Sequence, residues 1–318
     1  MNRSLTFFTI CMVSFLLTAT AASARQKVLY IDSYHQGYDW SDGITRGVKT
    51  VLKDKDVDLR IFRMDTKRNP SEDFKKESAR KAIDLIKSFR PDVVIASDDN
   101  ASKYIIQPFY KDADLPFVFC GVNNNASKYG FPFRNVTGMV EVSPVAKLIY
   151  SLKHFNRVVK VGYLASDTTT ERMDGEAYDA EIDIQYVQRY AKDFDAWMTE
   201  YKSLQDEVDI LIVGNNAGIT DWDDAAAMRV IRNNTRIPTG CVLDWLVDYS
   251  FLGYTKSPEE HGEWAANSAL KILDGTSAGS IPIVKSRKGN LIINTKIASA
   301  LGVEIPQSYT KIAQRIIK

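Results

Sequence analysis

The sequence predicts an α/β fold made of two similar Rossmann-like lobes, each built on a parallel sheet. Its strand-like runs are apolar without alternation, and amphipathic helix patterns separate them. Strands of this kind are buried on both faces of a parallel sheet. Three landmarks at strand ends also recur in the same order in the two halves: KVLYIDSY (27–34) with KVGYLASD (160–167), DVVIASDDN (92–100) with DILIVGNNA (209–217), and Leu115-Pro116 with Ile237-Pro238. This repetition favours two lobes over one large sheet.

The elements of the first half can be placed in order along the chain. VLYID (28–32) predicts a buried strand, and the apolar spacing that follows predicts a helix over about 42–53. LRIFRMD (59–65) predicts the second strand, after which Pro70 begins a long amphipathic helix that ends at Phe89. The next expected elements are the strand DVVIAS (92–97), a helix over about 101–110 and the strand PFVFCGV (116–122).

Residues 1–24 are expected to form a secretory signal peptide. Arg3 provides the positive start, a long apolar run follows, and Ala22-Ser23-Ala24 is a small-residue cleavage site. This site argues against an uncleaved anchor, and no later stretch approaches the roughly 18 uncharged apolar residues that a spanning helix needs. We therefore expect cleavage after Ala24 and a mature protein in the periplasm.

Composition excludes several classes of partner and reaction. The chain has 41 basic and 40 acidic residues, which gives no reason to expect binding to nucleic acid or to an anionic membrane. The three histidines lack any metal-binding spacing, so no metal or cofactor is expected. GTSAG (275–279) fits the serine-nucleophile pattern, but a predicted helix precedes it where a strand is required, so no catalytic residue is expected. Cys120 and Cys241 lie in apolar runs and are predicted to be buried free thiols.

The lobes are expected to be joined by two crossovers. One is RNVTGMVEVSP (134–144), and the other is expected near Cys241–Leu246. The chain would then return to the first lobe through the helix HGEWAANSALKILDG (261–275). The expected division is residues 25–140 and 247–318 in lobe 1 and residues 141–246 in lobe 2.

Polar and aromatic residues gather at the predicted carboxyl ends of the strands, where open parallel sheets bind their ligands. In lobe 1 the expected ligand-binding residues are Ser33, Tyr34, His35, Trp40, Asp98, Asp99, Asn100, Gly121 and Asn123. In lobe 2 they are Asp167, Thr168, Thr169, Asn215, Asn216 and Asp244.

These residues also predict the charge of the ligand. Helices are expected to begin directly after residues 98–100 and after residues 215–216, with free N–H groups facing the cleft. The candidates include four aspartates and no lysine or arginine, which favours an amine-bearing ligand over a simple anion. The alternative is that the polar residues at 98–100 only cap a helix and that Asn215 and Asn216 only form a turn.

Several stretches resemble exported substrate-binding proteins of ABC transporters, in the group that includes binders of tryptophan and tyrosine. They are NVTGMVEV (135–142), VDYSFLGYT (247–255), AANSALKILDGTSAGSIPI (265–283) and the tail LIINTKIASALGVEIPQSYTKIAQRII (291–317). SYHQGYDW (33–40) resembles the opening of a subgroup found beside, or fused to, bacterial sensor kinases. The resemblance implies a type I periplasmic binding fold with a central ligand cleft. Family members usually have a small uncharged segment where this chain has Ser97-Asp98-Asp99-Asn100-Ala101, and its two aspartates favour a different amine or polar solute.

The sequence thus predicts a monomeric solute-binding protein that captures a small polar ligand, such as an amino acid, and delivers it to an ABC permease. Two alternatives stay open. The same cleft could serve a sensory partner of a membrane kinase or chemoreceptor, or the scaffold could carry an enzyme.

Overall fold

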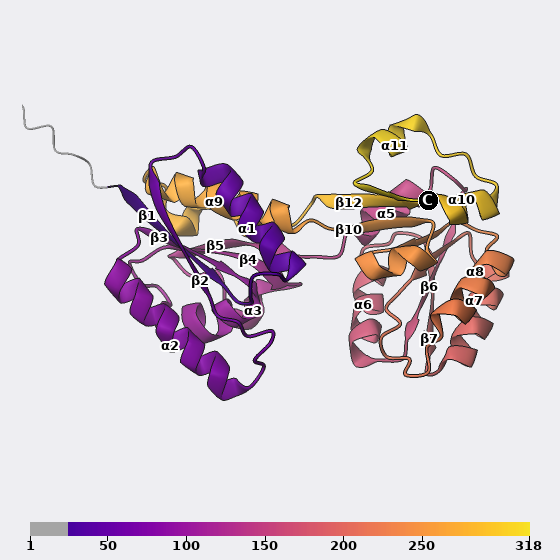
Figure 1. Ribbon diagram of the computed structural model, residues 1–318, viewed down its shortest axis with the longest axis horizontal. Helices are drawn as coiled ribbons and strands as arrows, with labels where there is room; N and C mark the ends of the chain where they lie inside the picture. Colours follow the sequence, from indigo (N-terminus) through magenta and orange to yellow (C-terminus); the bar gives the residue numbers. More distant parts are fainter. Residues whose placement is uncertain (1–24) are drawn as a thin grey trace, which may run out of the picture.

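The computed structural model describes residues 25–318 and consists of two α/β lobes joined by short connections (Figure 1). The strand order is β11-β5-β4-β3-β1-β2 in one sheet and β13-β12-β10-β9-β8-β6-β7 in the other. The expected signal peptide and its cleavage site lie outside the described residues. Two mostly parallel sheets in two lobes confirm the predicted fold class.

Lobe 1 is a parallel sheet covered by helices on both faces. Its strands are β1 (Gln26–Asp32), β2 (Val57–Arg63), β3 (Val93–Ser97), β4 (Phe117–Asn123), β5 (Val136–Glu141) and β11 (Val284–Lys285). Its helices are α1 (Asp39–Leu52), α2 (Glu72–Phe89), α3 (Asp98–Ala101), a π-helical segment (Ser102–Ile106), α4 (Gln107–Phe109) and α9 (Pro258–Leu273), with 3₁₀ turns at Ala126–Tyr129 and Ala278–Ser280.

Alternate residues of β1 face the two layers of helices, as the period of a strand requires. Val28 and Tyr30 belong to the apolar cluster that includes α1 and α9, whereas Leu29 and Ile31 belong to the cluster that includes α2. The helices α1 and α9 pack backbone against backbone, because a Cβ at Gly262 would meet the carbonyl oxygen of α1 at Ile44.

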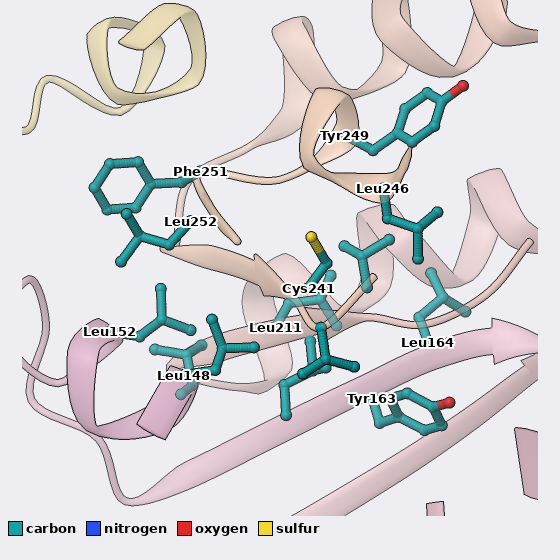
Figure 2. Packing of buried hydrophobic residues seen from close by; sticks show 14 of the residues in the cluster. Leu148, Leu152, Tyr163, Leu164, Leu211, Cys241, Leu246, Tyr249, Phe251 and Leu252 are labelled. Atoms are coloured by element: carbon teal, nitrogen blue, oxygen red, sulfur yellow. The ribbon is translucent and has the colours of Figure 1, made fainter. Parts of the chain in front are cut away.

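Lobe 2 repeats this layout with one additional strand. Its strands are β6 (Lys160–Ser166), β7 (Gln185–Ala191), β8 (Ile210–Val213), β9 (Thr239–Cys241), β10 (Leu252–Lys256), β12 (Gly289–Asn294) and β13 (Arg315–Ile317). Its helices are α5 (Val145–Leu152), α6 (Thr169–Asp179), α7 (Phe194–Glu207), α8 (Asp224–Asn234), α10 (Thr295–Leu301) and α11 (Gln307–Ile312), with a 3₁₀ segment at Asp244–Tyr249. Figure 2 shows Leu148 and Leu152 of α5 packed with Leu211 and Cys241 in the core of this lobe.

The predicted correspondence between the two halves is confirmed. β1, β3 and β4 hold the same places in the first sheet that β6, β8 and β9 hold in the second. Cys120 in β4 and Cys241 in β9 are both buried and free, as predicted.

The predicted crossovers are only partly right. The chain enters lobe 2 after β5, through residues 142–144, within the expected segment. It does not return near Cys241–Leu246, because β10 pairs with β9 and extends the second sheet. The return comes after β10, at Ser257, the N-cap residue of α9.

A third crossover was not expected. After α9 and β11, residues 286–288 lead back to lobe 2, where β12 pairs antiparallel with β10 and β13 pairs with β12. The expected division is therefore corrected: residues 247–256 and 289–317 belong to the sheet of lobe 2 and its connections, and residues 258–285 to lobe 1. Within residues 25–318, no helix is both long enough and apolar enough to cross a membrane.

Candidate functional site

The candidate site in lobe 1 is organised around Asp98, which directly follows β3. Its φ of 69° lies in the left-handed region that Asp and Asn tolerate better than most residues. Its side chain is only 2% exposed, and Nε1 of Trp40 donates a 2.8 Å hydrogen bond to Oδ1. The other oxygen, Oδ2, has no hydrogen-bond partner among residues 25–318. Burial, and next the negative charge of Glu141, raise the pKa of Asp98 well above its ordinary value.

Gly121 shapes the wall beside this carboxylate. A register shift between Cys120 and Val122 marks a bulge in β4, and Gly121 at its centre has a φ of 69°. A Cβ at this position would lie 2.7 Å from Oδ1 of Asp98, so the site requires a glycine here.

The bulge also directs the N–H of Gly121 toward Nδ1 of the buried His261, at 3.2 Å. Because Nδ1 accepts this bond, a neutral His261 carries its proton on Nε2. Burial lowers the pKa of His261 to about 3, so the ring is neutral near pH 7. The ring of Trp40 lies beside it, with centroids 5.3 Å apart.

Asp99 and Asn123 form a second polar pair on the same edge. Nδ2 of Asn123 donates to Oδ2 of Asp99 at 2.6 Å, and Tyr129 donates its hydroxyl to Oδ1 at 2.7 Å. Nζ of Lys128 lies 2.8 Å from the same Oδ1. Within the described chain, neither Asp98 nor Asp99 accepts a hydrogen bond from a backbone N–H at the start of the following helix, so the capping alternative does not explain them.

Ser33 and Asn100 hold the loop after β1 against the start of α3. Oγ of Ser33 donates to the carbonyl of Ser97 at 2.5 Å and accepts from the N–H of Ala101 at 2.9 Å. Nδ2 of Asn100 donates to Oγ1 of Thr66 at 2.7 Å, and Thr66 donates in turn to the carbonyl of Ser33. These two side chains therefore already have protein partners.

The aromatic residues after β1 form a rim. Tyr34 and Tyr38 meet edge to face at 5.5 Å, and Nζ of Lys67 lies 5.1 and 5.0 Å from their ring centroids. His35 is half-buried, with Nδ1 2.9 Å from the carbonyl of Gln36.

In lobe 2, the start of α6 contains three of the predicted residues. Asp167 is paired with Arg172 at 2.7 Å, and that guanidinium lowers the pKa of its carboxyl. Thr168 is the N-cap residue and accepts from the N–H of Glu171 at 3.3 Å. Thr169 is the first residue of α6 and is exposed.

The remaining predicted residues of lobe 2 lie in turns. Oδ1 of Asn215 accepts from the N–H of Ala217 at 2.9 Å, and the carbonyl of Asn216 accepts from Ile219 at 2.9 Å. The expected helix start after Asn216 is wrong, because α8 begins only at Asp224.

Asp244 is exposed, in the 3₁₀ segment that follows β9. It pairs with Arg315 of β13 at 2.8 Å. It does not line the cavity described next, whereas Asn123 and Asn215 do.

A cavity of about 270 Å³ lies between the lobes at these strand ends. Its lining residues are Asn123, Asn124, Ser143, Tyr163, Thr170, Glu171, Asp174, Tyr178, Ile212, Val213, Gly214, Asn215, Val242, Leu243 and Lys256. A larger groove of about 1010 Å³ lies on the outer face of lobe 1, beside α2 and α4, away from the strand ends.

The sequence reasoning missed the charged residues of this cavity. Glu171 is 4% exposed and accepts from the hydroxyl of Tyr163 at 2.5 Å and from the N–H of Asn215 at 3.1 Å. Asp174 follows one turn later on α6, and burial raises the pKa of both carboxyls. A search extended by two helical turns beyond Thr169 would have found both.

Lys256, at the end of β10, joins the two lobes. Its Nζ lies 2.5 Å from Oε1 of Glu141, the last residue of β5. Their separation of 115 residues gives no sequence signal for this contact.

The four predicted aspartates differ in their neighbours. Asp99, Asp167 and Asp244 each have a lysine or arginine within 4 Å. The predicted site residues include no lysine or arginine, but Lys128, Arg172 and Arg315, which were not among them, oppose these three. In the described chain, no such cation lies within that distance of Asp98. No group of three or more His, Cys, Asp or Glu residues in this part of the chain is arranged to hold a metal ion.

Comparison with known proteins identifies the type of protein. Residues 37–317 match the family described as ABC transporter substrate binding protein. Among curated proteins, no sequence matches the chain significantly.

Similar solved structures share this fold. The ligand-free, open structure of a substrate-binding protein with adhesive properties from Clostridium difficile is 18% identical, with a TM-score of 0.71, over 92% of this chain and 99% of that one. An ABC domain from Streptococcus pneumoniae in complex with L-Trp is 18% identical, with a TM-score of 0.52, over 92% and 100%. An ABC transporter solute-binding protein from Bradyrhizobium sp. BTAi1 with bound bis-tris is 14% identical, with a TM-score of 0.56, over 90% and 86%.

Proposed function

Because this chain belongs to the family of ABC transporter substrate-binding proteins, we propose that it captures a small polar ligand bearing an amine between its lobes and delivers it to an ABC permease. The family is one of solute-binding proteins and not of enzymes. The proposed site of action is the periplasm, and the proposed working form is a monomer.

The observation that carries the proposal is the buried carboxyl group of Asp98 and its unpartnered oxygen. The carboxyl group of Asp98 is 2% exposed, and within residues 25–318 one of its oxygens lacks a hydrogen-bond partner and no cation lies within 4 Å. Burying a carboxylate in this way costs free energy. An amine bound at this strand end would supply both the missing hydrogen bond and the missing charge.

The residues around Asp98 favour recognition of an amine with an apolar body. Trp40 holds one oxygen of the carboxyl and offers its ring beside the site. The rim of Tyr34 and Tyr38 adds aromatic surface on the same loop. A few fixed polar groups among aromatic side chains are typical of sites for small organic ligands.

The test is the substitution Asp98→Asn, with affinity measured by calorimetry. Native mass spectrometry of the purified protein would identify a co-purified ligand, and a panel of amines and amino acids would supplement it. Asn tolerates the left-handed backbone and can still accept the hydrogen bond from Trp40, so the variant removes the charge and little else. We expect Kd to rise about 30-fold or more, the loss for truncating one side of a buried charge pair.

Asp244→Asn is the matched control, because Asp244 is exposed and already paired with Arg315. Its affinity should equal that of the parent. If Asp98→Asn also binds like the parent, or if the ligand is a plain anion, the proposal fails.

The sensory alternative uses the same cleft with a different membrane partner. Genes for a permease and an ATPase beside the coding sequence would support transport, whereas a gene for a sensor kinase would support sensing. Chemical conversion of the bound ligand would support an enzyme instead.

A further inference from the structure

Lobe 2 has a carboxylate site of its own at the inter-lobe cavity. Glu171 and Asp174 lie three residues apart on α6, so their side chains project from the same face of the helix. Both line the cavity, together with the ring of Tyr163.

Neither carboxylate has a lysine or arginine within ion-pair distance among residues 25–318, although the charge of Lys256 offsets part of the rise that burial gives the pKa of Asp174. Glu171 receives hydrogen bonds on Oε2 from the neutral donors Tyr163 and Asn215, whereas its Oε1 receives none from residues 25–318. Asp174 has no hydrogen-bond or ion-pair partner in the described part of the chain. Glu171 is 4% exposed and lines the cavity, so a cation that enters the cavity can contact its free oxygen.

The basic side chains nearby are already engaged. Lys256 lines the same cavity, but its Nζ is paired with Glu141 at 2.5 Å. Arg172, on the outer side of α6, is paired with Asp167 at 2.7 Å. Among residues 25–318, the lining of this cavity thus has two acidic side chains without an ion-pair partner and no unpaired lysine or arginine that could hold a ligand carboxylate.

Asn123 connects the surroundings of Asp98 with the cavity that Glu171 and Asp174 line. Asn123 lines the cavity and is held by Asp99, the neighbour of Asp98. A ligand at Asp98 could therefore extend past Asn123 into lobe 2.

On these grounds we infer that the ligand has two separated cationic groups, one held by Asp98 and one by Glu171 and Asp174, and is a diamine or longer oligoamine. This inference rests on the proposed function, since it places the first amine at Asp98. The rings of Tyr163 and Tyr178 suit both the apolar stem between the amines and a cation over an aromatic face.

Calorimetry with defined probes tests the inference. We expect 1,4-diaminobutane, 1,5-diaminopentane or spermidine to bind at least about 10-fold more tightly than 1-aminobutane, since a second buried charge pair adds more than one factor of ten. Asp174→Asn should reduce this advantage, because it removes one of the two carboxylates that hold the second amine. Asp179→Asn, an exposed change on the same helix, should alter neither affinity.

The outcomes separate this inference from the proposed function. If 1-aminobutane or L-tryptophan binds as well as the diamines, and Asp174→Asn changes nothing, the second cation is refuted while an amine site at Asp98 stands. If none of these amines binds, or if the co-purified ligand is an anion, both fail. If Asp174→Asn lowers the melting temperature, Glu171→Gln is used in its place to compare the affinities for the diamines and for 1-aminobutane.

Discussion

Replacing Lys256 by Met should destabilise the protein, and more at pH 8 than at pH 5. Nζ of Lys256 lies 2.5 Å from Oε1 of Glu141, and the two side chains are 25% and 11% exposed. Met keeps most of the apolar stem but leaves the Glu141 carboxylate buried without its cation. Breaking a fully buried pair costs about 3 to 5 kcal/mol, and the partial exposure of Lys256 reduces our expectation to about 2 to 3 kcal/mol at pH 8.

The pH dependence follows from the proton on Glu141. Burial raises the pKa of Glu141 in the parent, and Lys256 opposes that rise. Without Lys256 the pKa rises further, so the folded variant holds a proton that the unfolded chain has lost. Stability therefore falls as pH increases between the unfolded and the folded pKa, and the deficit of the variant shrinks at pH 5.

Urea unfolding of the parent, Lys256→Met and the double variant Lys256→Met/Glu141→Gln measures these differences. The double variant should recover most of the loss at pH 8, because it buries no carboxylate at this position. Lys296→Met, at an exposed lysine, should stay within about 0.5 kcal/mol of the parent. An equal loss at both pH values, or a double variant no better than the single one, would refute the reasoning.

Three further predictions concern the site and the thiols. Binding of an amine at Asp98 should release protons, because the ligand lowers a pKa that burial has raised. Calorimetric heats that do not depend on the buffer's ionisation enthalpy would contradict this. Gly121→Ala should lower both the melting temperature and the ligand affinity, because its Cβ would clash with Asp98. Gly37→Ala is the control: its φ is 89° with open space around it, so it should show only the backbone cost of about 1 to 2 kcal/mol. Equal losses of stability in the two variants would count against the contact with Asp98. Cys120 and Cys241 should react with a thiol reagent only on unfolding, because burial raises the pKa of both thiols, to about 12 for Cys241. Rapid labelling of the folded protein would show that these two thiols are not buried as described.

The strands were predictable because a strand that is buried on both faces of a sheet has a continuous run of apolar residues. VLYID and DVVIAS are apolar without alternation, and they form β1 and β3 within one or two residues of the expected bounds. The repeated landmarks also located equivalent strands in the two sheets.

The assignment of the C-terminal part to a lobe could not be read in the same way. β10, β12 and β13 have ordinary strand patterns, and nothing in their composition indicates which sheet they join. Their place depends on pairing across long separations, such as the antiparallel register of Leu252 with Ile293. The local periodicity of the sequence carries no information about such pairings.

The candidate site was predictable at the strand ends and not beyond them. The strand-end rule found Asp98, Gly121 and Asn123 because they directly follow β3 or lie at the end of β4. It stopped short of Glu171 and Asp174, which the geometry of α6 brings back to the cavity.

The position of α9 has a consequence for how the chain folds during synthesis. This helix covers the face of the first sheet that includes Val28 and Tyr30, yet it follows β10 of lobe 2. A nascent chain that has reached Glu141 contains all the long strands of lobe 1 but not α9. The apolar surface that α9 covers in the folded protein therefore stays exposed to water or to a chaperone until Leu273 has been synthesised. The N-terminal lobe, although translated first, is therefore completed late, and cutting the chain between the lobes would not yield two folding units.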